Sequence, residues 1–145
     1  MTASTGRAPL RSVSPGRAVL DTSVLIATEK GRSIDESALP DDPVLSVVTL
    51  AELQAGVLAA ADSESRARRM STLDRYSLTE VLDVTEYVAA EWARLRVHLA
   101  EHRRRVNVND LWIAASAVAH RLPIVTQDDD FDPLDGVRGL VVVKV

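Results

Sequence analysis

Short, mainly apolar runs along this chain alternate with longer segments whose apolar residues repeat at helical spacing. The runs span residues 17–20, 44–48, 80–84, 123–125 and 140–143. Such runs are typical of strands buried on both faces of a parallel sheet, and their alternation with helices predicts right-handed crossovers. We therefore expect an α/β fold, a three-layer α/β/α sandwich around a small central sheet that is mostly parallel.

The clearest helical pattern lies in the second half of the chain. Residues 85–104 repeat apolar positions on one face, which predicts the longest helix of the protein. That face consists of Val88, Trp92, Leu95 and Leu99. Residues 110–120 are apolar around most of the helix, so we expect this segment to be buried between its neighbours. A short helix is predicted over residues 22–27.

Residues 50–76 predict a helical hairpin. A helix over residues 50–60 is followed by a polar break at 62–65 and by a second helix with apolar residues at three-residue steps. These apolar residues are Ala67, Met70 and Leu73. Because the hairpin is more apolar than a small sheet requires, we expect part of it to bind a partner or a second copy, with packing inside the domain as the alternative.

Composition narrows the class of protein. Of the 145 residues, 46% are apolar but only 3% are aromatic, which suits helices on an aliphatic sheet better than an all-β barrel. The chain has no cysteine, which excludes disulfides, a Cys-based zinc site and a thiol nucleophile. No segment resembles a signal peptide or reaches the ~20 apolar residues of a membrane span, so we expect a cytoplasmic protein without membrane contact.

The first 16 residues differ from the rest of the chain. They mix Ser, Thr, Pro, Gly and Arg without apolar periodicity, which predicts a disordered leader, or a translation start placed too early, before one folded domain of residues 17–145. The net charge of −4 does not by itself indicate nucleic-acid binding. Arginines nevertheless concentrate at residues 66–75 and 94–105, where a polyanion would meet a local basic track.

Carboxylates stand at four places where a strand ends or a helix begins. These acids are Asp21, Glu52, Asp110 and the run Asp128, Asp129 and Asp130. Because the carboxyl ends of parallel strands share one edge of a sheet, we expect the acids to converge in the crevice where such folds bind ligands. Clustered carboxylates repel one another unless a cation joins them, and all-oxygen ligands suit hard divalent ions. The sequence therefore predicts a Mg²⁺ or Mn²⁺ site.

Each acid also has a purely structural explanation. Thr49 and Glu52 have the spacing of a capping box. Asn107 and Asp110 fit a related arrangement, and Asp21 can cap the helix that follows it. A carboxylate near a helix N-terminus contributes about 0.3 to 1 kcal/mol, which is reason enough for it to occur there. For a single position capping is the better explanation, but four such positions at one sheet edge favour a binding site.

Four segments that contain these acids resemble the signatures of PIN-domain ribonucleases. They are VLDTSVLI at residues 19–26, TLAEL at 49–53, NDLWIAA at 109–115 and VTQDDDF at 125–131. In size, spacing and hairpin, the chain most resembles the VapC-type toxins of type II toxin-antitoxin pairs. The resemblance implies a PIN-like fold, a Mg²⁺- or Mn²⁺-dependent endoribonuclease that hydrolyses RNA, a homodimer, and inhibition by a small cognate antitoxin.

The resemblance also implies roles for individual acids. Asp21 and Asp110 match the direct metal ligands of the family, and Glu52 matches its third acid. The fourth acid is Asp128 by the family's Thr-x-Asp pattern, although Asp130 also matches an acid position of many relatives. A metal held by these acids would lower the pKa of a bound water and polarise the scissile phosphate. In-line attack would leave 5′-phosphate and 3′-hydroxyl ends.

Two further groups are candidate substrate contacts. The hydroxyl group consists of Thr22, Ser23 and Thr126, and the basic group consists of Arg103, Arg104 and Arg105. The hydroxyls can bond a phosphate or orient a carboxylate. The arginines stand just upstream of Asp110 and can follow a phosphate backbone, but ion pairs with Glu101 on a helix surface explain them equally well.

Two other functions stay open at the level of sequence. His98, Glu101 and His102 match the H-x-x-E-H pattern of zinc hydrolases, although the three arginines that follow would oppose a cation. The other is a PIN-like module that binds without catalysis. Intact acids at all four positions argue against that second function.

Overall fold

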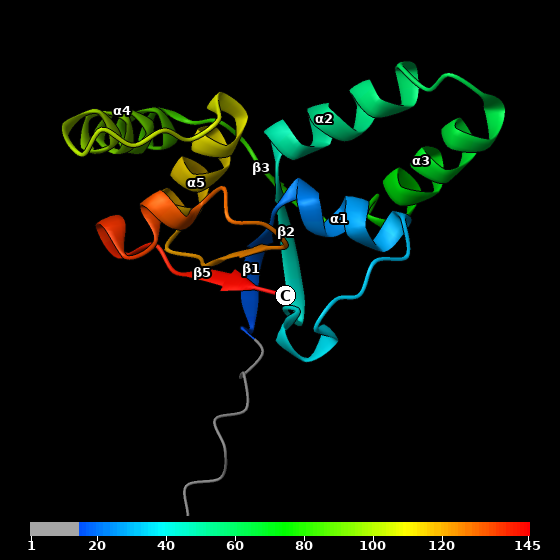
Figure 1. Ribbon diagram of the computed structural model, residues 1–145, viewed down its shortest axis with the longest axis horizontal. Helices are drawn as coiled ribbons and strands as arrows, with labels where there is room; N and C mark the ends of the chain where they lie inside the picture. Colours follow the sequence, from blue (N-terminus) through cyan, green and yellow to red (C-terminus); the bar gives the residue numbers. More distant parts are fainter. Residues whose placement is uncertain (1–14) are drawn as a thin grey trace, which may run out of the picture.

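Within residues 15–145, which the computed structural model describes, five short strands form one parallel sheet (Figure 1). The strands are β1 (Arg17–Leu20), β2 (Asp42–Ser46), β3 (Glu80–Leu82), β4 (Ile124–Thr126) and β5 (Val142–Lys144). Their order across the sheet is β3-β2-β1-β4-β5, and each neighbouring pair is parallel. The predicted small parallel sheet is thereby confirmed.

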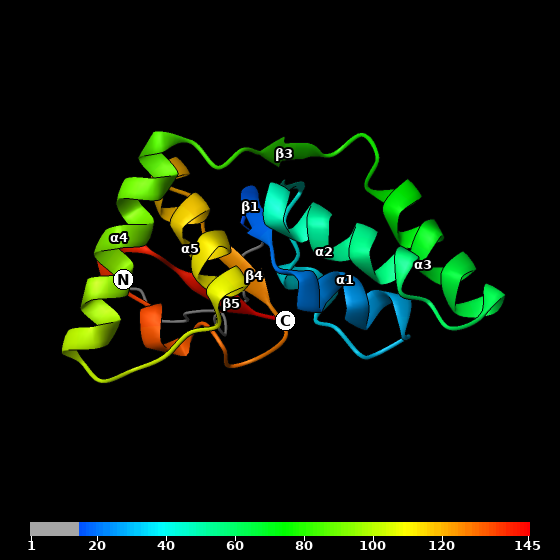
Figure 2. The ribbon, with the colours of Figure 1, turned by 90° about the horizontal axis from the view of Figure 1, so that it is seen from above.

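Helices cover both faces of the sheet. They are α1 (Thr22–Glu29), α2 (Val47–Leu58), α3 (Ser63–Arg75), α4 (Glu86–Glu101) and α5 (Val108–His120), with 3-10 turns at Glu36–Ala38, Asp132–Leu134 and Val137–Gly139. Seen from above, α4 and α5 lie on one side of the sheet, and α1 with the α2–α3 hairpin lies on the other (Figure 2). This arrangement is the predicted three-layer α/β/α sandwich with a helical hairpin.

Consecutive strand residues point to opposite faces and so build two separate hydrophobic clusters. The cluster beneath α4 and α5 includes Val19, Val44 and Ile124, with Leu95, Ile113 and Phe131 fully buried against them. The cluster beneath α1 and the hairpin includes Leu20, Leu45 and Val125, with Leu25 and Leu53. On α4, Val88, Leu95 and Leu99 are buried and Trp92 is partly buried, which confirms the predicted apolar face.

The second strand is shorter than the predicted run of residues 44–48. It ends at Ser46, whose hydroxyl accepts a hydrogen bond from the Val48 amide at 3.1 Å and caps α2. The helix begins after this capping residue, although the next two residues, Val47 and Val48, are still apolar. The apolar run therefore spans the end of the strand and the start of the helix. The predicted capping box of Thr49 and Glu52 is therefore wrong, because both residues lie inside the helix.

The outer half of the hairpin is less buried than its apolar spacing suggested. Ala67 is exposed and Met70 is 45% exposed, whereas Leu73 packs on the smaller cluster. The residue of α3 that is buried is Thr72, whose hydroxyl donates to Glu29 Oε1 at 2.8 Å. The hairpin therefore projects from the sheet, as Figure 1 shows, instead of lying flat on it.

The predicted leader falls mainly on residues 1–14, which lie outside the described residues. Pro15 and Gly16, which the sequence assigned to that leader, belong to the edge of the sheet, because their carbonyls accept hydrogen bonds from the Asp41 and Asp42 amides at 3.3 and 2.8 Å. Across residues 15–145, none of the helices combines the length and apolar character that crossing a bilayer demands.

Candidate functional site

Asp21 is the residue at which β1 ends and α1 begins. Its amide donates to the Val125 carbonyl at 2.9 Å, which continues the strand pairing, and its carboxylate accepts from the Ser23 amide at 3.3 Å, which caps α1. The predicted cap is confirmed. Thr126 Oγ1 donates to the same carboxylate oxygen, Oδ2, at 3.0 Å. Burial raises the pKa of this carboxyl, with repulsion from Asp128 adding to it.

Asp110 lies in the first turn of α5. Asn107 caps this helix by accepting a hydrogen bond from the Asn109 amide at 2.9 Å, as the sequence predicted, but the Asp110 carboxylate receives no hydrogen bond from the described residues. Burial, as the largest cause, and repulsion from the surrounding carboxylates together raise its pKa to about 7. In decreasing order of effect, these neighbours are Asp21, Asp130, Asp128 and Glu52. This repulsion indicates that the predicted acids other than Asp129 lie near Asp110 at the start of α5.

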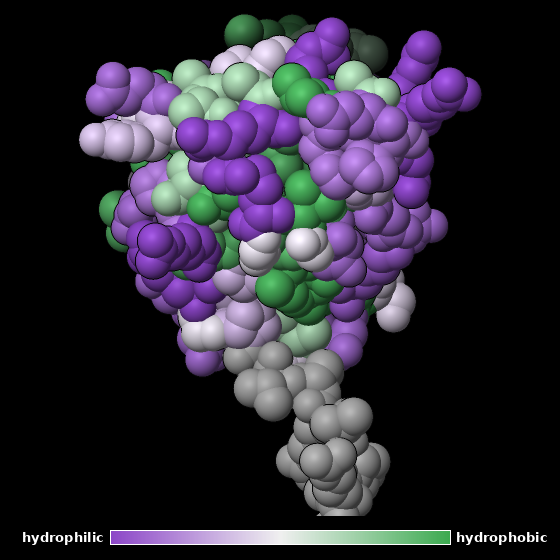
Figure 3. Space-filling view, turned by 90° about the vertical axis from the view of Figure 1, so that its left-hand side faces the viewer, coloured by the Kyte–Doolittle hydropathy of each residue, from purple (hydrophilic) through white to green (hydrophobic). Residues whose placement is uncertain are grey.

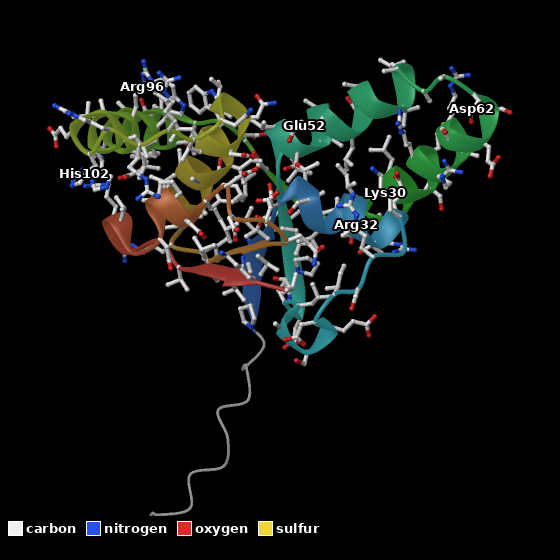
Figure 4. All side chains as sticks on the ribbon, viewed as in Figure 1. Lys30, Arg32, Glu52, Asp62, Arg96 and His102 are labelled. Carbon is white, nitrogen blue, oxygen red and sulfur yellow. The ribbon has the colours of Figure 1, made fainter. Side chains whose placement is uncertain are left out.

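Glu52 reaches the cluster from α2, at the base of the hairpin (Figure 4). Thr22 Oγ1 donates to its Oε1 at 2.7 Å, and Asn109 Nδ2 donates to its Oε2 at 3.4 Å. The Thr22 hydroxyl also lies 3.1 Å from that of Thr49, which is fully buried. Asn109 and Thr49 were not predicted from the sequence as site residues. Their positions could have indicated them, because Asn109 is next to Asp110 and Thr49 lies one helical turn before Glu52.

The acid run after β4 places two of its three carboxylates at the site. Asp128 Oδ1 lies 3.3 Å from Thr126 Oγ1, so Thr126 contacts the carboxylates of both Asp128 and Asp21. Asp130 is exposed, yet it raises the pKa of Asp110 more than Asp128 does. Asp128 thus lies beside Asp21 and Asp130 lies toward Asp110. The third carboxylate, Asp129, instead pairs with Lys144 at 2.5 Å.

The predicted hydroxyl group lies between the acids. Thr22 holds Glu52, and Thr126 joins Asp21 to Asp128. Ser23 Oγ lies 3.2 Å from Thr126 Oγ1 and accepts from the Gln127 amide at 3.0 Å. In this arrangement the hydroxyls orient carboxylates, which is one of the two roles that the sequence allowed.

The donor set suits a hard cation, although its carboxylates do not yet surround one point. Among residues 15–145, no three acidic or imidazole side chains are arranged to hold one ion. The Asp110 carboxylate, which accepts no hydrogen bond from residues 15–145, nevertheless leaves oxygen ligands available beside repelling charges. A divalent cation bound beside these carboxylates would relieve that repulsion.

The histidine motif does not form a zinc site. His98 and His102 stack with ring centroids 4.1 Å apart, and His102 Nδ1 lies 2.8 Å from the carbonyl of His98. His102 is the residue that ends α4 and not a member of the helix. Stacked rings direct their nitrogens side by side and not toward a shared ion, so this geometry does not support a zinc hydrolase.

The predicted basic group lies on the connection between α4 and α5. Arg103, Arg104 and Arg105 are exposed, and within the described part of the chain none of their guanidinium groups pairs with Glu101 or another carboxylate. On the same helix, by contrast, Glu91 pairs with Arg94 at 3.0 Å. Ion pairing on a helix surface therefore does not account for these three arginines.

The fold and the acidic sheet edge define the class of protein, and comparison with known proteins agrees. The chain matches the PIN domain over residues 18–137 and belongs to the PIN-domain family. It is similar to Ribonuclease VapC5 of Mycobacterium tuberculosis, with 54% identity over 134 residues that cover 92% of this chain and 99% of that protein. Ribonuclease VapC4 of the same organism is 41% identical over 126 residues, 87% and 97% of the two chains.

A solved structure supports the same grouping. The chain superimposes with a TM-score of 0.84 and 51% identity on a member of the VapBC family of toxin-antitoxin systems, VapBC-5 from Mycobacterium tuberculosis, covering 90% of this chain and 100% of that one. These findings confirm the resemblance to VapC-type toxins and the PIN-like sandwich.

Proposed function

We propose that this protein is the toxin of a toxin-antitoxin pair and that it hydrolyses RNA as a Mg²⁺- or Mn²⁺-dependent endoribonuclease. One observation carries the proposal: five carboxylates from four separate segments converge at one sheet edge, where burial and repulsion raise the pKa of Asp110 to about 7. The ribonuclease names of the two relatives support the reaction, and the acid cluster supports the cation.

Asp21 and Asp110 are the proposed direct ligands of the ion, Glu52 the third, and Asp128 with Asp130 the carboxylates that complete the site. When bound, the ion supplies a water of lowered pKa and neutralises charge on the scissile phosphate. The protein's own part is to orient these acids. Thr22 holds Glu52 and Thr126 holds Asp21, so each carboxylate has a defined direction.

The proposed partners follow from the surface and from the relatives. The solved relative VapBC-5 is a member of a family of toxin-antitoxin systems, so we propose a small antitoxin as the inhibitor of this chain. The hairpin exposes apolar side chains, with Leu58 83% and Met70 45% exposed, which suits a bound antitoxin helix or a second copy. With RNA as the substrate, the site of action is the cytoplasm, and the proposed assembly is a homodimer.

The test compares the wild type with Asp21→Asn and Asp110→Asn. We expect RNA cleavage by the wild type to require Mg²⁺ or Mn²⁺, and both variants to lose it while melting as cooperatively as the wild type. Asp129→Asn is the matched control, because its carboxylate faces Lys144 and not the site. Sequencing of RNA ends after induction of each form identifies the target RNA as well.

Two results would refute the proposal. Undiminished cleavage by both variants would remove the assigned acids from the reaction. RNA binding by the wild type without any metal-dependent cleavage would instead make the protein a binding module.

A further inference from the structure

Two neighbouring clefts extend from the acidic site across the C-terminal end of α4. The first, here called the arginine cleft, has a volume of about 580 Å³ and is lined by Arg96, Arg103, Arg104 and Arg105 around Leu99 and Leu111. The second, of about 520 Å³, shares Arg104 and Arg105 and continues past Asn107 to three carboxylates, those of Asp129, Asp130 and Asp132. Because Asp130 acts on Asp110, and Leu111 directly follows Asp110, the arginine cleft lies next to the candidate reaction site.

The arginines of this cleft are available to a ligand. Within residues 15–145 none of the four guanidinium groups forms an ion pair. By contrast, Arg94 of α4 and Arg138 of the turn Val137–Gly139 both pair with Glu91 of α4. Arg96 lies 5.8 Å from the ring centroid of Trp92. Four unpaired cations around one cleft of a chain with net charge −4 indicate a local site for a polyanion.

The backbone fixes where these arginines point. At the end of α4 the Arg104 amide donates to the Leu99 carbonyl at 2.9 Å and the Arg103 amide to the Ala100 carbonyl at 3.2 Å, the paired bonds of a Schellman motif. Arg103 takes the left-handed conformation, with φ of 52°. This turn folds the chain back over Leu99, so the three consecutive arginines stand on the rim of the cleft and do not continue the helix axis.

The walls between the arginines are apolar. Leu99 is buried at the floor, Leu111 is buried beside it, and Val106 is partly buried. Figure 3, which faces the α4 end of the molecule, shows hydrophilic side chains projecting around apolar patches. A cleft of about 580 Å³ falls within the ~300–1,000 Å³ of ordinary small-molecule sites, so it has room for a nucleotide.

We infer that the arginine cleft binds one unpaired nucleotide of the RNA next to the cleaved phosphate, with the base between arginine planes and apolar walls and the phosphates on Arg104 and Arg105. This inference rests on the proposed ribonuclease function. Unstacked bases of single-stranded loops stack on guanidinium planes, whereas the bases of a duplex stay inside the helix. The substrate is therefore single-stranded at the nucleotide that flanks the cut.

The first test measures the salt dependence of RNA binding by a form that does not cleave. In the Asp21→Asn background, fluorescence anisotropy with a labelled single-stranded RNA is recorded between about 50 and 200 mM salt. The slope of log K against the logarithm of the salt concentration is about −0.7 per phosphate contact. The double variant Arg104→Ala with Arg105→Ala should bind the RNA more weakly. Because it loses two phosphate contacts, the slope of log K against log salt concentration should become shallower by about 1.4. Arg32→Ala with Arg75→Ala is the control of equal charge, and Figure 4 shows Arg32 on the opposite side of the molecule from Arg96.

A second measurement isolates the base. A single strand should bind roughly 10-fold or more tightly than a blunt hairpin of equal length, because only the single strand gains base stacking. Arg96→Gln should reduce that preference without changing the salt slope.

Equal slopes for the arginine pair and the control pair would overturn the inference, as would equal binding of single strand and hairpin. Loss of antitoxin binding with unchanged RNA binding would also overturn it and assign the cleft to a protein. Failure of the ribonuclease proposal itself appears separately, as absence of cleavage by the wild type, because these binding measurements involve no cleavage.

Discussion

The two helical pairs on either side of the acidic site are held in the protein in different ways. In the α4–α5 pair, α5 buries six residues and α4 buries Val88, Leu95 and Leu99. In the α2–α3 pair the buried residues are Thr49, Leu53 and Thr72, and Leu58 near the tip is 83% exposed. The two helical pairs form the two walls of the site. The α4–α5 wall is therefore held by close packing in the core, whereas the α2–α3 wall is attached to the domain only at its base.

Polar contacts compensate for the missing packing on the hairpin side. Arg69 donates to the Gly56 carbonyl at 2.6 Å, which joins α3 to α2, and Thr72 donates to Glu29 of α1. Glu52 itself is oriented by Thr22 and Asn109. Packing in the core therefore positions Asp110, whereas hydrogen bonds position Glu52. Because the hairpin has fewer buried residues, we expect it to be the region that opens first.

The largest expected effect is the difference between the acids of the two walls. A metal supplies several kcal/mol of transition-state stabilisation, and each ~1.4 kcal/mol is tenfold in rate, so Asp110→Asn should reduce kcat/KM by roughly 10³-fold. Glu52→Gln should cost less, about 10- to 100-fold, because the Gln carbonyl oxygen can still accept the bond from Thr22, although the amide nitrogen cannot accept the one from Asn109. Steady-state cleavage of one RNA measures both, and equal losses would show that the two walls contribute alike.

The next effect concerns stability. Leu95→Ala removes a fully buried side chain beneath α5 and should lower the free energy of unfolding by about 2–5 kcal/mol. Leu58→Ala makes the same change on the exposed tip of the hairpin and should alter it by less than about 0.5 kcal/mol. Urea unfolding monitored by circular dichroism measures both. A similar loss at Leu58 would mean that the hairpin tip is packed in solution, for instance in a dimer.

A smaller effect is expected for the hydroxyls that orient the acids. Thr22→Val removes the donor to Glu52 at similar volume and should lower metal affinity or activity about 10- to 100-fold. Thr22→Ser, which keeps the hydroxyl, should recover most of it. Isothermal titration with Mn²⁺ separates metal affinity from turnover. If Val and Ser variants lose equally, shape and not hydrogen bonding is what Thr22 supplies.

The smallest expected effect is on the pH dependence of stability in chelator. The pKa of Asp110 is raised to about 7 in the folded protein. Its contribution to the free energy of unfolding is therefore fully present below the pKa that this carboxyl has in the unfolded chain, and it is lost as pH rises through about 7. The wild type should therefore melt a few degrees lower at alkaline than at acidic pH, with partial screening of this half-exposed group. Asp110→Asn should flatten that dependence, and Mg²⁺ should restore the alkaline melting temperature only in the wild type.

Much of this fold is readable from local patterns. The apolar face of α4 and the short runs that become β1 and β4 follow from periodicity alone, because burial and backbone geometry demand the same spacing. Asp21 and Asp110 were predictable as well, since each stands at a junction that a parallel sheet brings to one edge. The end of β2 was not, because Val47 and Val48 suit a strand and a buried helix turn equally.

The rest of the site depends on contacts between distant segments. Nothing in the local sequence states that Asn109 reaches across to Glu52, 57 positions away, or that Thr126 contacts Asp21 from 105 positions away. For the same reason the sequence allowed two explanations of Arg103, Arg104 and Arg105. In the described residues none of the three arginines pairs with Glu101, and their contact with the substrate stays a prediction.

The conformation of Arg103 has a consequence for how this protein can be altered. A left-handed residue after a helix is usually glycine, and a side chain there costs about 1–2 kcal/mol. Arg103→Gly should thus make the protein harder to unfold while removing a cation from the cleft. Under the proposed role of Arg103 in the cleft, this turn exchanges stability for RNA binding, and selection for thermal stability alone would favour glycine there.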